Sequence, residues 1–395
     1  MSPESTSLAT RAIKRSFHGV KSTYQSLSTR INATLAMAKI ELKTGRGVSI
    51  PMSRRLWLWR RGFTSRFDGL FDVTEGNYDQ YLSDYQEFRS YDINEPWKDE
   101  MDNKLTAHLL MLPFEEHLPT LFGVLEAGEV RRHPAYEGQS ETPALDDAAA
   151  IEHFERYDAR TYVDTLLEEE DAVVLKPLLG SGGLGVYVVR TDDTSGGYLI
   201  NGSTYTEERF DELLDELEMY MVTEFSEQSA FLDELFPDSA NTIRVVTMWD
   251  YEADEPFIAW AHLRVGTEES APLDNLSQGG IQAGIDIDTG EMLYAAKIGD
   301  KSPPIGVDWY DEHPTTGARL AGRTIPHWEA VADGITEMAE AYPQFPYVGW
   351  DVLLTDDGFE ILELNSSPGM INTQIESKVL DEPRVRRFYE RHDVL

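Results

Sequence analysis

The chain from residue 345 to residue 365 reads Phe345-Pro346-Tyr347-Val348-Gly349-Trp350-Asp351-Val352-Leu353-Leu354-Thr355-Asp356-Asp357-Gly358-Phe359-Glu360-Ile361-Leu362-Glu363-Leu364-Asn365. Two apolar runs flank an Asp-Asp-Gly sequence, which is a strong signal for a β-hairpin. A three-residue loop over residues 356–358, with Gly358 in the left-handed conformation, would place Asp351 directly across from Glu363. Side chains alternate between the two faces of a strand, so Ile361, Glu363 and Asn365 are expected to share one face.

The hairpin predicts a site for a hard divalent cation. Asp351, Glu363 and Asn365 supply two carboxylates and one amide, and such oxygen donors suit Mg²⁺ that is bound together with nucleotide phosphates. The alternative is an acidic surface hairpin that binds nothing. Because Ile361 is expected on the same face, that face should be partly buried, and polar groups placed there need a partner.

The composition is strongly acidic. The 395 residues include 71 acidic side chains and 34 basic ones, of which 10 are Lys and 24 are Arg. The acids are spread along the whole chain, which favours a halophilic protein whose carboxylates keep the surface hydrated at high salt. An acidic protein that binds a cationic partner is the alternative. The absence of Cys excludes disulfides, thiolate metal sites and a Cys nucleophile.

The N-terminal region has the opposite charge. Residues 1–66 contain 13 Lys and Arg and two acids, a net charge of +11 that leaves −48 on the other 329 residues. The run Arg54-Arg55-Leu56-Trp57-Leu58-Trp59-Arg60-Arg61 suits peripheral contact either with an anionic membrane or with the protein's own acidic body. Nucleic acid is not expected as a partner, because the acidic remainder would repel it.

The chain has no hydrophobic run of the ~18 residues needed to span a bilayer and no signal-peptide hydrophobic region, so a cytoplasmic protein is expected. The pattern of strands and helices predicts an α+β fold with four regions. These are a basic helical segment over 1–66, a helical and α+β region over 67–150, a lid subdomain over 151–225, and a C-terminal subdomain over 226–395 that carries the hairpin.

A glycine-rich loop over residues 180–185 lies between two runs, 172–177 and 186–190, that read as strands. Its G-x-G-x-x-G spacing matches the dinucleotide-binding motif, but that motif opens a helix, and here a strand follows. The loop is therefore interpreted as a flap whose backbone N–H groups cover phosphates while Lys176 pairs with them. A mobile hairpin with a surface Lys is the alternative. Lys176 lies in an apolar strand and is the only Lys between residues 105 and 296, which favours the phosphate-binding interpretation.

The hairpin, the glycine loop and Lys176 occur in the order and spacing of the ATP-grasp superfamily. Over about residues 100–375 the chain resembles its carboxylate–amine ligases, and most closely the alpha-L-glutamate ligase-related, sugar-transfer-associated ATP-grasp proteins. The resemblance implies an ATP-grasp fold, in which two α+β lobes clasp ATP, here preceded by the helical basic segment.

The resemblance also implies roles for individual residues. Arg244, in an N-T-x-R strand, would face phosphate or acyl phosphate and act in catalysis together with Lys176. The implied ATP-binding residues are Lys104, Lys176, Gly180, Ser181, Gly182, Gly183, Gly185 and the hinge Thr223, Glu224 and Phe225. The implied metal ligands are Asp351, Glu363 and Asn365. The N-L-x-x-G-G loop would contact substrate through Asn275, Ser277, Gln278, Gly279 and Gly280.

The function implied by the resemblance is a carbon–nitrogen ligase that uses ATP and Mg²⁺ or Mn²⁺. A small-molecule or glycan-precursor carboxylate would attack the γ-phosphate, and an amine would displace phosphate from the acyl phosphate with release of ADP. Two alternatives remain open: a small-molecule kinase on the same fold, and an ATP-binding scaffold without chemistry in a polysaccharide-assembly complex.

Overall fold

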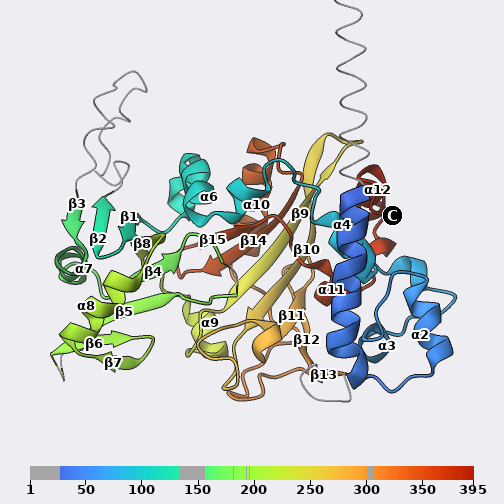
Figure 1. Cartoon of the computed structure of the whole chain (residues 1–395), viewed down its shortest axis with the longest axis horizontal. Helices are drawn as coiled ribbons and strands as arrows, with labels where there is room; N and C mark the ends of the chain where they lie inside the picture. Colours follow the sequence, from blue (N-terminus) through green and yellow to red (C-terminus); the bar gives the residue numbers. More distant parts are fainter. Residues whose placement is uncertain (1–26, 133–155, 181, 193, 195, 300–305) are drawn as a thin grey trace, which may run out of the picture.

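The computed structural model describes residues 27–132, 156–180, 182–192, 194, 196–299 and 306–395. Two antiparallel sheets organise this part of the chain (Figure 1). The eight-stranded sheet, in the order β3-β2-β1-β8-β4-β5-β6-β7, lies at the left of the view, and the seven-stranded sheet, in the order β13-β12-β11-β10-β9-β14-β15, lies at its centre. The prediction of an α+β fold is confirmed.

The strands of the first sheet are β1 (Leu121–Glu126), β2 (Glu129–Arg132), β3 (Arg156–Asp158), β4 (Val173–Pro177), β5 (Tyr187–Asp192), β6 (Gly197–Ile200), β7 (Ser203–Tyr205) and β8 (Tyr220–Glu224). Those of the second are β9 (Thr242–Asp250), β10 (Glu255–Val265), β11 (Ile281–Ile285), β12 (Met292–Ile298), β13 (Val307–Tyr310), β14 (Tyr347–Leu354) and β15 (Phe359–Asn365).

A helix over residues 27–44 precedes the named helices. These are α2 (Met52–Trp59), α3 (Phe67–Leu70), α4 (Asp84–Ser90), α5 (Lys98–Asp102), α6 (Lys104–Met111), α7 (Ala159–Leu167), α8 (Glu207–Glu216), α9 (Ala230–Leu235), α10 (Trp328–Ala341), α11 (Met370–Thr373) and α12 (Pro383–Arg391). No helix in the described ranges is both long and apolar enough to cross a bilayer.

Helices α7 and α8 pack on the first sheet. Helix α8 begins after Thr206, whose hydroxyl accepts a hydrogen bond from the Arg209 N–H at 3.3 Å. Its Phe210 and Leu214 are buried in the core of this sheet. Strands β1 and β2 belong to the same sheet, so this sheet contains strands from before residue 150 as well as from after it. The division into four regions stays a prediction, and residues 133–155, which contain the boundary predicted at 150, lie outside the described residues.

The two faces of the second sheet have different surroundings. Helix α10 covers one face and buries Trp328, Val331 and Ile335 against it, because its apolar residues recur with helical spacing. Helix α12 buries Phe388 and Tyr389 over part of the opposite face. The remaining part of that opposite face carries charged side chains, and these form the candidate site.

The hairpin of β14 and β15 pairs Asp351 with Glu363 as predicted, although its loop differs from the prediction and a β-bulge is present. Leu354 pairs with Phe359, so the loop has four residues, 355–358, and Gly358 is not left-handed. A β-bulge at Leu362 then restores the expected register. The bulge also corrects the prediction for Ile361, which packs with Val352 in the apolar core on the face opposite Glu363.

The basic N-terminal region contacts the acidic residues that follow it. Arg54 pairs with Asp68 at 2.6 Å, Arg61 with Glu75 at 2.9 Å and Arg66 with Asp84 at 2.7 Å. The guanidinium groups of Arg54 and Arg61 also lie over the Trp57 ring, at 4.4 and 4.2 Å from its centroid. These cations are therefore already paired within the protein. Contact of the region with a membrane stays a prediction, and residues 1–26 lie outside the described residues.

Candidate active site

A row of polar side chains crosses the second sheet from β10 to β15. Strand pairing places His262 opposite Arg244, Arg244 opposite Asp351, and Asp351 opposite Glu363. Directly paired residues project to the same face of a sheet, so these four side chains form one continuous strip. Strands that are widely separated in sequence thus bring Arg244 beside the predicted metal ligands.

Two arginines hold the Asp351 carboxylate. Arg244 donates to both of its oxygens, with Nη2 at 3.1 Å from Oδ2, and Arg264 Nη2 lies 3.0 Å from Oδ2. The two guanidinium groups keep the pKa of Asp351 well below its usual value even though burial opposes ionisation. Arg244 also donates from Nη1 to the Pro368 carbonyl at 2.9 Å, which fixes its orientation.

Glu363 lies near both of the predicted ATP-binding lysines. Lys104 Nζ is 3.3 Å from Glu363 Oε1 and donates to the Gly180 carbonyl at 2.9 Å. Burial lowers the pKa of Lys176 to about 8, although the nearby Glu363 carboxylate favours its charged form. Burial raises the pKa of Glu363. Lysines from α6 and β4 thus meet a carboxylate from β15, where the two sheets approach each other.

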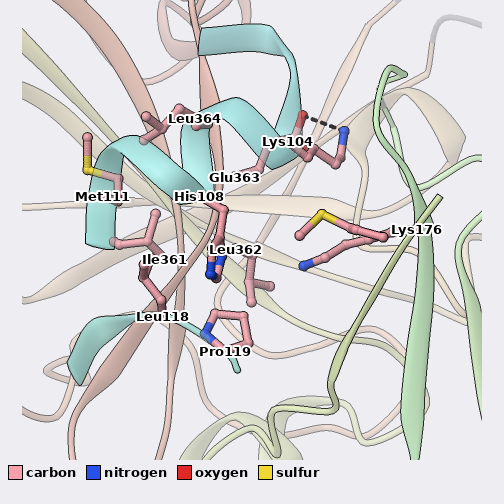
Figure 2. Close-up of a pocket in the computed structure, with 12 residues that line it drawn as sticks. Lys104, His108, Met111, Leu118, Pro119, Lys176, Ile361, Leu362, Glu363 and Leu364 are labelled. Carbon is pink, nitrogen blue, oxygen red and sulfur yellow. Dashed lines mark hydrogen bonds and ion pairs between the residues drawn. The ribbon is translucent and has the colours of Figure 1, made fainter. Parts of the chain in front are cut away.

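These side chains line a narrow cavity of about 20 Å³ (Figure 2). Lys104, His108 and Met111 come from α6, Lys176 from β4 and Glu363 from β15. Figure 2 shows the Lys176 side chain extending into this cavity. The cavity itself has room for a water-sized group.

The glycine loop follows β4 and closes over this region. Gly182, Gly183 and Gly185 have φ of 72°, 71° and 77°, and Gly180 has φ of 141°, conformations that favour glycine. A Cβ on Gly183 would lie 2.4 Å from the Leu273 side chain, so the loop approaches its neighbour closely. Ser181, also predicted to bind ATP, lies outside the described residues.

The predicted substrate loop meets the glycine loop. It contains a short 3₁₀ helix over Leu276–Gln278 that ends at Gly279, which is left-handed with φ of 108°. Gln278 Nε2 donates to the Gly182 carbonyl at 3.3 Å, and the Asn275 side chain also lies beside Gly182. Gly280 packs tightly on the Asp274 carbonyl, which lies 2.3 Å from where a Cβ would be. No contact in the described structure assigns a role to Ser277.

The predicted adenine hinge lies at the end of β8. Glu224 accepts hydrogen bonds from the Thr120 N–H and hydroxyl, at 3.1 and 2.7 Å. The Thr223 hydroxyl is buried and has no partner in the described part of the chain. The Arg190 guanidinium lies over the Phe225 ring at 4.7 Å. The side chains of Glu224 and Phe225 therefore contact the first sheet and its borders.

The three predicted metal ligands share one face of the hairpin. Glu363 and Asn365 are two residues apart on β15, and Asn365 pairs with Gly349, two residues before Asp351. The donor set fits a hard cation chemically, since it consists of two carboxylates and an amide oxygen. In the structure Asp351 is bound by arginines and Asn365 Nδ2 lies 3.5 Å from the Gly349 carbonyl. To bind a metal, Asp351 would have to exchange an arginine for the ion.

Arg264 and Asp274 belong to this site and were not predicted from the sequence. Arg264 lies two residues after His262 on β10, and it contacts Asp274 at 3.4 Å as well as Asp351. The alternation of Trp260, His262 and Arg264 in this apolar stretch was a signal that could have revealed Arg264. Asp274 lies in a loop, where no periodic pattern marks it.

Comparison with known proteins gives one family assignment. A model of the family described as sugar-transfer associated ATP-grasp matches residues 92–388, and no curated protein matches. Among solved structures, the chain is similar to a D-alanine-D-alanine ligase from Coxiella burnetii with 10% identity and a TM-score of 0.34, over 78% of this chain and 60% of that one. It is similar to a biotin carboxylase from Campylobacter jejuni with 12% identity and a TM-score of 0.39, over 78% of this chain and 52% of that one. The family model spans most of the chain, and the chain belongs to the sugar-transfer associated ATP-grasp family.

Proposed function

We propose that the chain is an ATP- and Mg²⁺-dependent ligase that joins a carboxylate to an amine through an acyl phosphate and releases ADP. One observation carries this proposal: two lysines, two arginines and two carboxylates converge on one strip where the sheets meet. Such a concentration of fixed charge suits the transfer of a phosphoryl group, in which positioning and electrostatic stabilisation supply most of the rate.

The lysines and the glycine loop would bind the phosphates of ATP. Lys104 and Lys176 both line the cavity, and both lie near Glu363. The glycine loop directly follows the strand that carries Lys176, so its backbone N–H groups are close enough to cover the same phosphates. In this proposal Ser181 belongs to the covering loop, and the hinge over residues 223–225 holds the adenine.

The arginines would stabilise the charge that develops on the acyl phosphate. Asp351 and the Pro368 carbonyl fix Arg244 in position, so its guanidinium needs little reorganisation during the reaction. Arg264 would act beside it as a second cation. Residues Asn275 to Gly280 would contact the acceptor, since their loop reaches the glycine loop through Gln278.

Asp351, Glu363 and Asn365 would hold the metal ion. When bound, Mg²⁺ would neutralise charge on the β- and γ-phosphates. The chain supplies oxygen donors for this role on one face of the hairpin. Glu363, which forms an ion pair with Lys104 and lies near Lys176, would bind the ion more readily than Asp351, which two arginines already hold.

The family description supports a sugar or a glycan precursor as one of the substrates. The decisive experiment supplies pairs of carboxylates and amines, including sugar acids and amino sugars, and measures ADP together with the mass of the product. We expect ADP release that requires both partners, and loss of at least ~100-fold in rate for Lys176→Met, because phosphate positioning is lost. Lys98→Met, which changes a lysine that contacts the Tyr91 carbonyl, serves as the matched control.

The products separate the proposal from its alternatives. Release of AMP and pyrophosphate would refute the acyl-phosphate route. ADP release that needs no amine would instead indicate a kinase, and ATP binding without turnover of any pair would indicate a scaffold.

A further inference from the structure

A second cavity, of about 250 Å³, opens on the second sheet near the β10–β11 end of the polar strip. It forms because β10 and β11 stop pairing beyond Ala261 and Ile285, next to a β-bulge between Ile258 and Trp260. Its walls are mostly apolar and include Ile258, Trp260, Ile287 and Leu293. The cavity is large enough for a compact organic group.

Glu376 connects this cavity to the polar strip. The cavity is lined by Glu376, whose carboxylate accepts hydrogen bonds from Gln282 Nε2 at 3.2 Å and from the Gly284 N–H. A Cβ on Gly284 would lie only 2.0 Å from Glu376 Oε2. Gly284 pairs with His262, so the Glu376 carboxyl group occupies the next position of the strip, beyond His262.

Glu376 contacts no cation in the described structure. Arg264 is bound to Asp351 and Asp274, and Arg384, which also lines the cavity, is bound to Glu382 at 2.9 Å. Burial raises the pKa of Glu376 to about 8. The neighbouring His262 has a pKa held well below its usual value by burial and by Arg244 and Arg264, and its Nδ1 has no partner in the described residues. A cation bound here would stabilise the ionised form of the Glu376 carboxyl group, which lies beside a neutral imidazole.

We propose that this cavity binds the amine substrate, as a primary ammonium group on Glu376 with a compact apolar body against Trp260 and Leu293. This inference rests on the proposed ligase function, since it names the class of the second substrate. The site of phosphoryl transfer at Glu363 and Lys176 lies four strands away from Gly284 along the same row. At ~4.8 Å per strand, this spacing leaves room for an acyl phosphate over Arg244, between the two ends.

The experiment measures amine binding in the absence of nucleotide. Cyclohexylamine and isobutylamine are titrated into the full chain, and cyclohexanol and isobutanol serve as uncharged counterparts of the same shape. We expect each amine to bind at least ~10-fold more tightly than its alcohol, because only the amine gains a charge-assisted hydrogen bond. Glu376→Gln should abolish this preference while the alcohols bind as before.

The number of protons released when an amine binds is a second measurement. A purely structural role of Glu376 would not produce this release. Glu376 is mostly protonated at pH 7, so an ammonium group that ionises it should release close to one proton, seen by calorimetry in buffers of different ionisation enthalpy. The Glu376→Gln variant should release none. Equal binding of amines and alcohols, or unchanged proton release in this variant, would overturn the proposal.

A pair of neighbouring residues tests the location. Leu293 lines the cavity, whereas Tyr294, the next residue, is 59% exposed and lies outside its lining. Leu293→Trp should block both amines and alcohols, and Tyr294→Trp should bind like the wild type. If Leu293→Trp leaves binding intact, the cavity is not the site. ADP release from carboxylate–amine pairs, measured separately, tests the ligase proposal: ADP release that requires an amine, together with no amine preference in binding, overturns only this inference.

Discussion

Asp351 is held so closely by arginines that its first role is structural. Replacing it with Asn would leave Arg244 and Arg264 buried without their shared carboxylate. Breaking a buried ion pair in this way typically costs ~3–5 kcal/mol, so we expect Asp351→Asn to lower the free energy of unfolding by about that amount. Urea unfolding measures it, with the exposed Asp357→Asn as a control that should change stability by less than ~0.5 kcal/mol. Equal stability of the two variants would show that the arginines find other partners.

Glu87 makes the free energy of unfolding depend on pH in a direction that can be predicted. Burial raises its pKa to about 8, from about 4.5 in the unfolded chain, and its Oε2 has no partner in the described residues. The folded protein therefore binds this proton more tightly, and the free energy of unfolding should fall as pH rises from 4.5 to 8. Glu87→Gln should remove up to ~1.4 kcal/mol per pH unit from that slope. Unfolding curves at pH 5, 6.5 and 8 test this, and parallel profiles for variant and wild type would contradict it.

At the scale of the element, the glycine loop accepts hydrogen bonds from Lys104 and Gln278 and packs closely on Leu273 at Gly183. Gly183→Ala should disturb the contact between the loop and Leu273, because the new Cβ would lie 2.4 Å from Leu273 Cδ2 and this side chain or the loop would have to move, whereas Gly196, with nearly the same φ, has nothing within 4 Å. Both changes carry the strain of a left-handed residue, typically ~1–2 kcal/mol, so Gly196→Ala is the matched control. We expect faster hydrogen exchange over residues 178–186 and weaker ATP binding in Gly183→Ala alone. Equal effects in both variants would assign the loss to strain.

Other elements show what a sequence can predict. The hairpin and the strands beside the glycine loop follow from local patterns, and the structure confirms them. The bulge at Leu362 was not predicted, because alternation in a short apolar run does not reveal an extra residue. The contact between Arg264 and Asp351, and the position of Glu376 over Gly284, depend on how distant strands and segments meet. No local pattern contains that information.

At the scale of the whole molecule, the charged residues of the candidate site are distinct from those that make up the excess of acids. The cations at the site are each paired with a carboxylate or lie beside one, as Lys104 does with Glu363 and Arg244 with Asp351. Arg54 of α2 and Arg61, which follows this helix, are paired with acids of the next segment. The excess of acids therefore lies elsewhere, and its effect should be general repulsion within the folded chain.

This repulsion predicts how stability responds to salt. With a net charge of −37, the folded chain is more compact than the unfolded chain and so suffers more from repulsion between carboxylates. Raising KCl from 0.1 to 1 M shortens the screening length from ~10 to ~3 Å, so the free energy of unfolding should rise by roughly 2 kcal/mol or more. Potassium sulfate at matched ionic strength separates screening from ion-specific hydration: equal gains in the two salts identify screening. A free energy of unfolding that stays constant or falls as KCl rises would show that the acids are already far enough apart at low salt, and the halophilic interpretation would be wrong.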